Sequence, residues 1–322
     1  MVTYHSTFDK PLDYKDIIYE KEKPIARIIL NRPEKMNALR HQLRGEVFHA
    51  LRVAEADPEV GVIIIKGNGR CFSAGYDLGG GNQGFTLPDV GPRHPGPGQW
   101  PRHLNAGYYL IWELEKVVIA QAHGYCLAGG TELAAYCDLF VVAQDLQIGY
   151  PPVRAMSPPD NLWFPWHMHM RKAKEMLFTG DPITGEEAVE LGLANYAVPA
   201  EKLDEFTTNL AKRVALIAPS LLALSKRQIN RVYDIMGHRM AMEVGNLYQG
   251  MNAMRPEAGE FARISREHGL KAALNWRDEK FGDYGTTPAA KMAREMRKAR
   301  EAQTAGARPT SPAARQALGR EE

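Results

Sequence analysis

Two apolar runs, each leading into a glycine-containing joint, constrain the fold of this chain more than any other feature. Residues 62–65, Val-Ile-Ile-Ile, form a continuous β-branched run, which is typical of a strand buried on both faces. Residues 117–122, Val-Val-Ile-Ala-Gln-Ala, form a second such run, and helical spacing begins after it at Gly129. Buried strands that alternate with helices predict an α/β fold.

The joint at Gly129-Gly130 is the first candidate for a functional site. The backbone N–H groups of a helix's first turn have no partner inside the helix, and glycines let a ligand oxygen approach them closely. Glu132 follows one helical turn after the amide of Gly129. The alternative is that the glycines only permit close packing and that Glu132 is a solvated acid at the start of a helix.

The run at residues 62–65 leads into a second loop of small residues, which includes Ala74-Gly75-Tyr76. This loop does not fit a nucleotide-binding pattern. Phe72 stands where a third glycine of a dinucleotide motif would be, and no Gly-Lys-Ser/Thr follows.

Three sequence words together resemble the crotonase, or enoyl-CoA hydratase/isomerase, superfamily. They are residues 31–39 (Asn-Arg-Pro-Glu-Lys-Met-Asn-Ala-Leu), 72–78 (Phe-Ser-Ala-Gly-Tyr-Asp-Leu) and 124–133 (Gly-Tyr-Cys-Leu-Ala-Gly-Gly-Thr-Glu-Leu). The resemblance implies a crotonase-like spiral of ββα repeats with a C-terminal helical trimerisation region, assembled as a homotrimer or hexamer. It also implies an acyl-CoA thioester substrate and no cofactor or metal besides the coenzyme A of that substrate.

Carried over by position, the resemblance assigns the site residues. The backbone N–H groups of Tyr76 and Gly129 would hold the thioester oxygen while negative charge builds on it, and such donors are worth a few kcal/mol each. The residues expected to contact the substrate or its coenzyme A are Ala38, Leu39, Ala74, Gly75, Asp77, Leu78, Tyr150 and Phe281.

The second carboxylate is where this chain departs from the family pattern. Hydratases of the family carry a second glutamate twenty residues after the first, and here Pro152 stands in its place. Asp160 matches an aspartate that dienoyl-CoA isomerases and aryl-CoA dehalogenases of the family use, so Glu132 and Asp160 are the expected catalytic pair. Alternatively, Asp160 is the N-cap of the next helix.

These features favour an enoyl-CoA hydratase-like enzyme that adds water to, or removes it from, a 2,3 double bond. An isomerase or a hydrolytic enzyme acting on a cyclic or aromatic acyl-CoA is the first alternative. A catalytically weak CoA-thioester-binding or RNA-binding protein is an alternative of another class.

Composition and organisation narrow these possibilities. A formal net charge of +2 over 322 residues argues against a general nucleic-acid binder, and no apolar run is long enough to span a membrane. Three cysteines without a Cys-x-x-Cys pair fit a reducing, cytoplasmic location. The expected regions are a spiral core (1–202), a helical oligomerisation region (203–283) and a basic helical and disordered tail (284–322), with a Gly/Pro-rich loop at 79–107.

Local patterns predict further elements. A strand pair is expected at residues 17–20 and 26–30, helices at 39–56, 203–236 and 239–250, and a capping box from Thr184 to Glu187. Arg154, close to Pro152, is a candidate contact for a polar group of the substrate.

Overall fold

The computed structural model describes residues 8, 10–78 and 99–282. Its main sheet has the strand order β1-β2-β3-β4-β6-β9. The hairpin of β1 (Ile17–Glu22) and β2 (Ile25–Leu30) is antiparallel, and all the other neighbours in this sheet are parallel. The parallel strands are β3 (Val62–Gly67), β4 (Val117–Ala122), β6 (Leu139–Ala143) and β9 (Tyr196–Val198). The two apolar runs are thus neighbouring central strands, covered on both faces, as their composition predicts.

A smaller sheet has the order β5-β7-β8. Its strands are β5 (Tyr125–Leu127), β7 (Gln147–Gly149) and β8 (Ile183–Thr184). β5 occupies the few residues between β4 and the glycine joint, and a bridge between Ser73 and Cys126 ties the 72–78 loop to it. The chain therefore passes from one sheet to the other immediately before Gly129.

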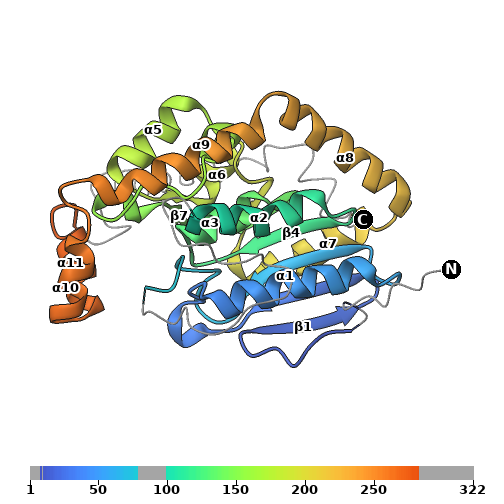
Figure 1. Ribbon diagram of the computed structural model, residues 1–322. Helices are drawn as coiled ribbons and strands as arrows, with labels where there is room; N and C mark the ends of the chain where they lie inside the picture. The colour runs from blue at the N-terminus through green and yellow to red at the C-terminus, as the bar shows by residue number, and fades with distance from the viewer. Residues whose placement is uncertain (1–7, 9, 79–98, 283–322) are drawn as a thin grey trace, which may run out of the picture.

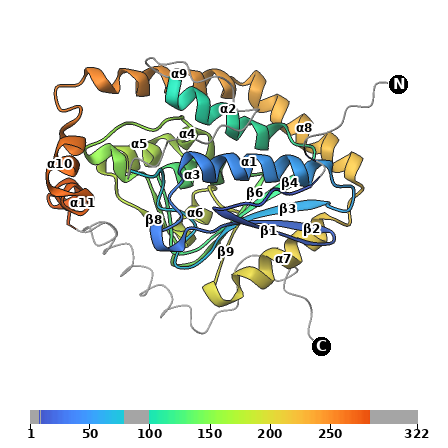
Figure 2. The same cartoon turned by 60° about the horizontal axis from the view of Figure 1, so that its bottom comes forward.

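Helices cover both faces of the main sheet (Figures 1 and 2). On one face lie α1 (His41–Ala56), α2 (Gln99–Glu113) and α3 (Gly129–Ala135), and α7 (Leu203–Val214) lies on the other. Leu203 and Phe206 of α7 pack in one cluster with Ile64 of β3. This helix of the expected oligomerisation region is therefore part of the packed core.

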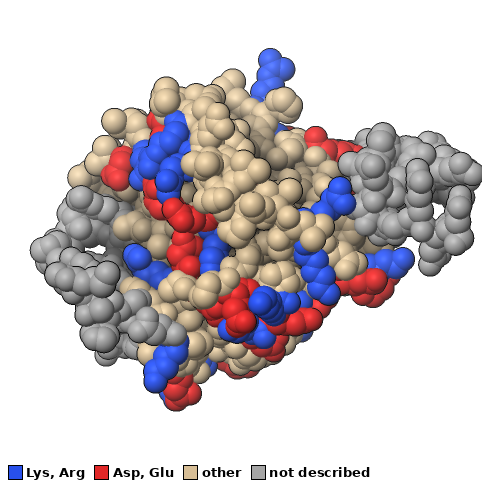
Figure 3. Space-filling view, turned by 90° about the vertical axis from the view of Figure 1, so that its right-hand side faces the viewer, with Lys and Arg blue, Asp and Glu red and all other residues tan. Residues whose placement is uncertain are grey.

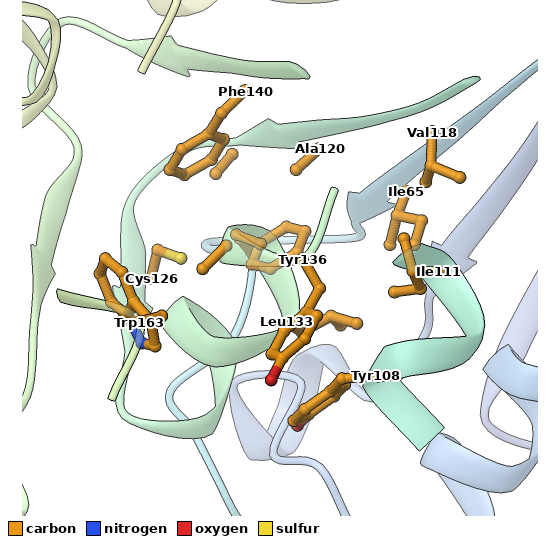
Figure 4. Packing of buried hydrophobic residues seen from close by; sticks show 14 of the residues in the cluster. Ile65, Tyr108, Ile111, Val118, Ala120, Cys126, Leu133, Tyr136, Phe140 and Trp163 are labelled. Carbon is orange, nitrogen blue, oxygen red and sulfur yellow. The ribbon is translucent and has the colours of Figure 1, made fainter. Parts of the chain in front are cut away.

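On the α3 face, aromatic and aliphatic side chains fill the space between sheet and helices. Leu133 of α3 and Tyr136 just after it share one buried cluster with Ala120 and Phe140, and Tyr108 of α2 belongs to the same cluster (Figure 4). The rings of Tyr108 and Tyr136 stack at a centroid distance of 5.4 Å. This packing fixes α2 against α3, the helix that carries Glu132.

The remaining helices come after β7 in the chain. α8 and α9 run along the outside of the molecule, and α10 and α11 lie at its far end (Figure 1). Their bounds are α4 (Phe164–His167), α5 (Met170–Thr179), α6 (Gly185–Glu190), α8 (Pro219–Ile235), α9 (His238–Gly250), α10 (Glu260–His268) and α11 (Leu270–Asp278), with 3₁₀ turns at Pro33–Lys35, Pro151–Arg154, Ala200–Lys202 and Met251–Met254.

The predicted strand pair, the 39–56 helix and the capping box of Thr184 with Glu187 are confirmed. Two predictions are wrong. The single helix expected at 203–236 is two helices, because Pro219 cannot continue the first one and instead begins α8. The loop expected at 79–107 is helical from Gln99 onward; residues 79–98 and the tail at 284–322 lie outside the described residues. None of the described helices is long and apolar enough to cross a bilayer.

Candidate active site

The two glycine-containing segments of the sequence meet in space. A Cβ atom added to Gly75 would lie 2.8 Å from Cβ of Ala128 and 3.4 Å from the backbone nitrogen of Gly129, so only glycine allows this approach. Leu39 pairs with Tyr76 in a parallel bridge, and its N–H donates to the Gly75 carbonyl at 2.8 Å. The backbone at Tyr76 and the first amide of α3 are therefore held on adjacent segments.

Strained backbone surrounds this junction. Met36 (φ 52°), Asn37 (φ 51°) and Ala128 (φ 49°) are non-glycine residues in the left-handed region. Ala74 N–H donates to the Met36 carbonyl at 2.9 Å, and the N–H of Thr131 to the Ala128 carbonyl at 2.9 Å. Such conformations persist where surrounding contacts impose them, and they often mark functional sites.

The expected substrate-contacting residues Ala38 and Asp77 share one partner. Arg32 Nη1 donates to the Ala38 carbonyl at 2.6 Å and to Asp77 Oδ2 at 2.8 Å. Leu78, the next residue, has an exposed fraction of 42%. The Arg32 guanidinium thus links residues 31–39 to residues 72–78, two of the three segments on which the family resemblance rests.

Glu132 lies on α3 with its side chain completely buried. Its Oε2 accepts a short hydrogen bond from the Tyr76 hydroxyl, and its Oε1 accepts one from the Asp160 N–H at 3.2 Å. The interpretation of Glu132 as a solvated acid is therefore wrong. The glycine joint that begins the helix also brings this carboxyl into the interior.

Asp160 lies next to Glu132, with an exposed fraction of 3%. It is not a helix N-cap, because α4 begins at Phe164 and the residue before that helix is Trp163. Its Oδ1 is buried, and no described residue forms a hydrogen bond with it. A buried carboxyl oxygen in this state can still accept a hydrogen bond from a water or a substrate group.

Burial perturbs the acidity of both carboxyls. Desolvation, and next the negative charge of Asp160, raise the pKa of Glu132 well above its ordinary value. Desolvation raises the pKa of Asp160 to about 7, although the nearby positive charge of Arg44 and a hydrogen bond with Tyr150 oppose that rise. Two like charges cannot both be held in such a site, so one of the carboxyls keeps a proton near neutral pH.

Four further side chains enclose the pair: Arg44 of α1, the rings of Tyr76 and Tyr108, and Tyr150. The hydroxyls of Tyr76 and Tyr108 are 3.0 Å apart, and Tyr150 is buried close enough to both carboxyls that their charges raise its pKa. Sequence reasoning proposed Tyr150 as a substrate contact and missed Arg44, Tyr108 and the phenol of Tyr76. An arginine beside the apolar positions Leu43 and Val47 of an amphipathic helix was the available signal for Arg44.

The remaining sequence candidates lie away from the carboxyl pair. Arg154 has a fully buried side chain and forms ion pairs with Asp181 at 2.8 Å and Asp278 at 3.0 Å. Its guanidinium carbon lies 4.5 Å from the ring centre of Phe281. Arg154 therefore joins the 3₁₀ turn after Tyr150 to the last helix, and Pro152 in that turn leaves no acid at the position of the family's second glutamate.

No cluster of three metal-binding side chains occurs among the residues that the structure describes. A cavity of about 420 Å³ lies beneath α8, lined by side chains that include Trp112, Tyr136, Lys226 and His238. Neither Glu132 nor Asp160 lines it, and Lys226 within it is held by Asp138 at 2.8 Å. This cavity is therefore separate from the buried carboxyl pair.

Known proteins resemble this chain over most of its length. The family model described as enoyl-CoA hydratase/isomerase matches residues 20–258. A crotonyl-CoA hydratase of Syntrophomonas wolfei is 33% identical over 222 residues, covering 67% of this chain and 82% of that protein. A hydroxycinnamoyl-CoA hydratase-lyase of Pseudomonas fluorescens is 31% identical over 233 residues, covering 69% and 80%. The crystal structure of an enoyl-CoA hydratase from Mycobacterium smegmatis has a TM-score of 0.77 at 34% identity and covers 87% of this chain and 98% of that one.

Proposed function

The chain belongs to the enoyl-CoA hydratase/isomerase, or crotonase, family of enzymes, and we propose that it adds water across the 2,3 double bond of an enoyl-CoA thioester, or removes it in the reverse direction. One observation carries this proposal: two buried carboxyls, Glu132 and Asp160, lie side by side at the start of the helix whose first amide faces the Gly75 segment. Hydration of a conjugated thioester needs such groups, since one proton must leave water and another must reach carbon.

The thioester carbonyl binds between the backbone N–H groups of Tyr76 and Gly129. These amides belong to the two adjacent segments at the glycine junction. As water attacks carbon 3, negative charge moves to the thioester oxygen, and fixed donors stabilise it without reorganising. Removing one such donor typically costs about 3–4 kcal/mol of transition-state stabilisation.

Asp160 acts as the base. Its pKa of about 7 leaves it substantially ionised at neutral pH, and its buried Oδ1 is available to a water molecule. Asp160 accepts a proton from that water as the oxygen bonds to carbon 3. Glu132, whose pKa is raised well above its ordinary value, holds the proton that goes to carbon 2. Asp160 thereby performs the work of the glutamate that Pro152 replaces.

The same pair also supports double-bond isomerisation. Two carboxyls with 0% and 3% exposure are largely shielded from solvent, which favours return of an abstracted proton to the substrate. Isomerisation needs no bound water, so the two reactions differ in the mass of their products. Isomerisation proceeds by proton transfers alone, whereas hydration also forms a bond between the water oxygen and carbon 3. We propose that neither reaction uses a metal or a redox cofactor.

A panel of enoyl-, dienoyl- and aryl-CoA thioesters in deuterated water tests the proposal. A hydratase gives a product heavier by one water, and Glu132→Gln and Asp160→Asn each reduce this product by about 10²–10⁴-fold. The matched control is Glu201→Gln, an exposed glutamate far along the chain, which retains the wild-type rate. Deuterium uptake without added water identifies an isomerase, and an unchanged panel leaves the CoA-binding alternative.

We also propose that the enzyme assembles as a trimer or hexamer through α8 and α9. Large apolar side chains on these helices are exposed, among them Leu224 (62%), Ile235 (86%), Met240 (70%) and Leu247 (68%). The face of the molecule at the α8 end carries interspersed acidic and basic residues below a largely uncharged upper area (Figure 3). Light scattering of the wild type beside Ile235→Asp tests this: the substitution shifts the assembly toward monomer.

The cytoplasm is the proposed location. Cys71 and Cys126 are buried free thiols and Cys137 is a partly buried one, which suits a reducing compartment.

A further inference from the structure

The hydroxyl of Tyr76 occupies a special position in the site. Glu132 is 0% exposed and Asp160 3%, and Tyr108 and Tyr150 are at 0% and 1%. Tyr76 is only partly buried and packs against the edge of this core cluster. Among these five side chains, Tyr76 is therefore the least enclosed, although its hydroxyl points inward to Glu132 and Tyr108.

The ring of Tyr76 lies directly over the first residue of α3. A Cβ atom added to Gly129 would be 2.5 Å from Cζ of the ring and 2.6 and 2.8 Å from its two Cε atoms. Because the backbone N–H groups of these same two residues are the proposed oxyanion donors, the phenol lies next to the bound thioester.

Both oxygens of Glu132 are already engaged. Oε1 accepts the Asp160 N–H, and Oε2 accepts the Tyr76 hydroxyl. The hydrogen bond at Oε2 links a proton on Glu132 to the phenol of Tyr76, which lies beside the first residue of α3.

We propose that Tyr76 is a catalytic residue whose phenol gives its proton to carbon 2 of the acyl group and recovers one from Glu132. The proposal rests on the proposed function. Water oxygen bonds to carbon 3, and the proton released from water goes to Asp160. The Tyr76 O–H bond breaks as the C–H bond forms at carbon 2, and the resulting phenolate takes the proton of Glu132 across their hydrogen bond. The proton on Asp160 then returns to the neighbouring Glu132, whose Oε1 accepts the Asp160 N–H.

A phenol suits this step. Burial raises the pKa of Tyr76 above its ordinary value, so the resting side chain carries its proton. The α-carbon of a thioester is still a much weaker acid, so proton transfer from the phenol to the enolate is favourable. The brief phenolate is stabilised by the Tyr108 hydroxyl at 3.0 Å and by the Arg44 guanidinium, whose carbon is 5.5 Å from the Tyr76 ring centre.

Two assays on Tyr76→Phe test this proton relay from Glu132 through Tyr76 to carbon 2. The variant keeps the ring and removes only the hydroxyl. The first measures hydration of an enoyl-CoA. The second measures exchange of the carbon 2 protons of a saturated acyl-CoA in deuterated water, which requires the enolate but no hydration. We expect both rates to fall by about 10²–10⁴-fold, with KM changed only a few-fold.

The matched control is Tyr109→Phe, a neighbouring tyrosine on α2 whose hydroxyl contacts His238 and not the carboxyls. It keeps both rates. Tyr108→Phe, which removes a hydrogen bond to the Tyr76 hydroxyl, shows a smaller loss in both assays and provides a second measurement if Tyr76→Phe folds poorly.

The outcomes separate the relay from the proposed function. If the wild type hydrates and Tyr76→Phe hydrates at a similar rate, the relay is overturned and the hydratase stands. If the wild type exchanges protons without hydrating and Tyr76→Phe loses the exchange, the relay stands and the hydratase is overturned. A wild type inactive in both assays overturns both.

Discussion

Asp160→Asn should stabilise the protein at neutral and alkaline pH. The folded protein holds the Asp160 proton up to about pH 7, whereas the unfolded chain releases it near pH 3.8. Because the folded state binds the extra proton in this window, the free energy of unfolding of the wild type falls as the pH rises from about 4 to about 7. A pKa difference of this size corresponds to about 4 kcal/mol, at 1.36 kcal/mol for each pKa unit. Asparagine carries no charge at any pH and avoids this loss.

The assay is urea unfolding of both proteins from about pH 4 to pH 8 at one protein concentration. The stability of the variant relative to wild type should rise by up to about 4 kcal/mol across this range. The matched control is Asp16→Asn, another buried carboxyl, whose Oδ1 accepts from Arg40 Nη2 at 2.6 Å. That substitution should destabilise the protein by about 1–3 kcal/mol at pH 8, since it weakens a charged hydrogen bond. A stability difference for Asp160→Asn that does not change with pH would refute the reasoning.

Three further perturbations test other parts of the structure. Gly129→Ala places a methyl 2.5 Å from Cζ of the Tyr76 ring. We expect thermal melting to show a free energy of unfolding lower by about 1–3 kcal/mol, and steady-state kinetics to show a large loss of kcat. A variant with the kcat of the wild type would contradict the site geometry. Arg154→Ala removes the buried partner of Asp181, while Asp278 keeps its ion pair with Arg277 at 2.6 Å. We expect urea titrations to show a free energy of unfolding lower by about 3–5 kcal/mol; an unchanged stability would show that the pairs of Arg154 contribute little. The kcat/KM of the wild type should fall on the acidic side of about pH 7, as Asp160 takes up a proton and ceases to act as the proposed base; a pH profile without that fall would assign the base elsewhere.

Local sequence signals predicted the elements whose structure depends on their own residues. The β-branched runs became β3 and β4, and Thr184 with Glu187 formed the predicted capping box. Pro219 could have predicted the start of a new helix, but the amphipathic pattern continues across 203–236 and favoured a single helix. The sequence did not predict that α2 begins at Gln99, because the neighbouring glycines and prolines favour a loop. The helix is stabilised by its later residues, which pack on the core.

Residues of the candidate site could be predicted from the sequence only where they belong to a recognisable motif. Glu132 and Gly129 follow from the strand-glycine-helix pattern, and Asp160 was found by its position relative to a family pattern. Whether Asp160 capped a helix or faced Glu132 could be decided only by the structure, because both depend on where the chain turns after Pro159. Arg44 could not be assigned to the site from sequence, since it reaches the carboxyls from a helix about ninety residues earlier in the chain.

The charges around Glu132 and Asp160 decide which of these two carboxyls keeps a proton. Arg44 is the buried cation beside the pair, and its charge favours ionisation of Asp160. One buried cation can balance one buried carboxylate, whereas a second uncompensated carboxylate would cost several kcal/mol. Above about pH 7 the favoured state therefore has Asp160 ionised and Glu132 protonated, with the tyrosine hydroxyls around them as donors. The proposed hydration takes one proton from water and gives another to carbon. Among the described residues, two buried acids beside Arg44 provide this arrangement before the substrate arrives, even though Pro152 stands at the position of the family's second glutamate.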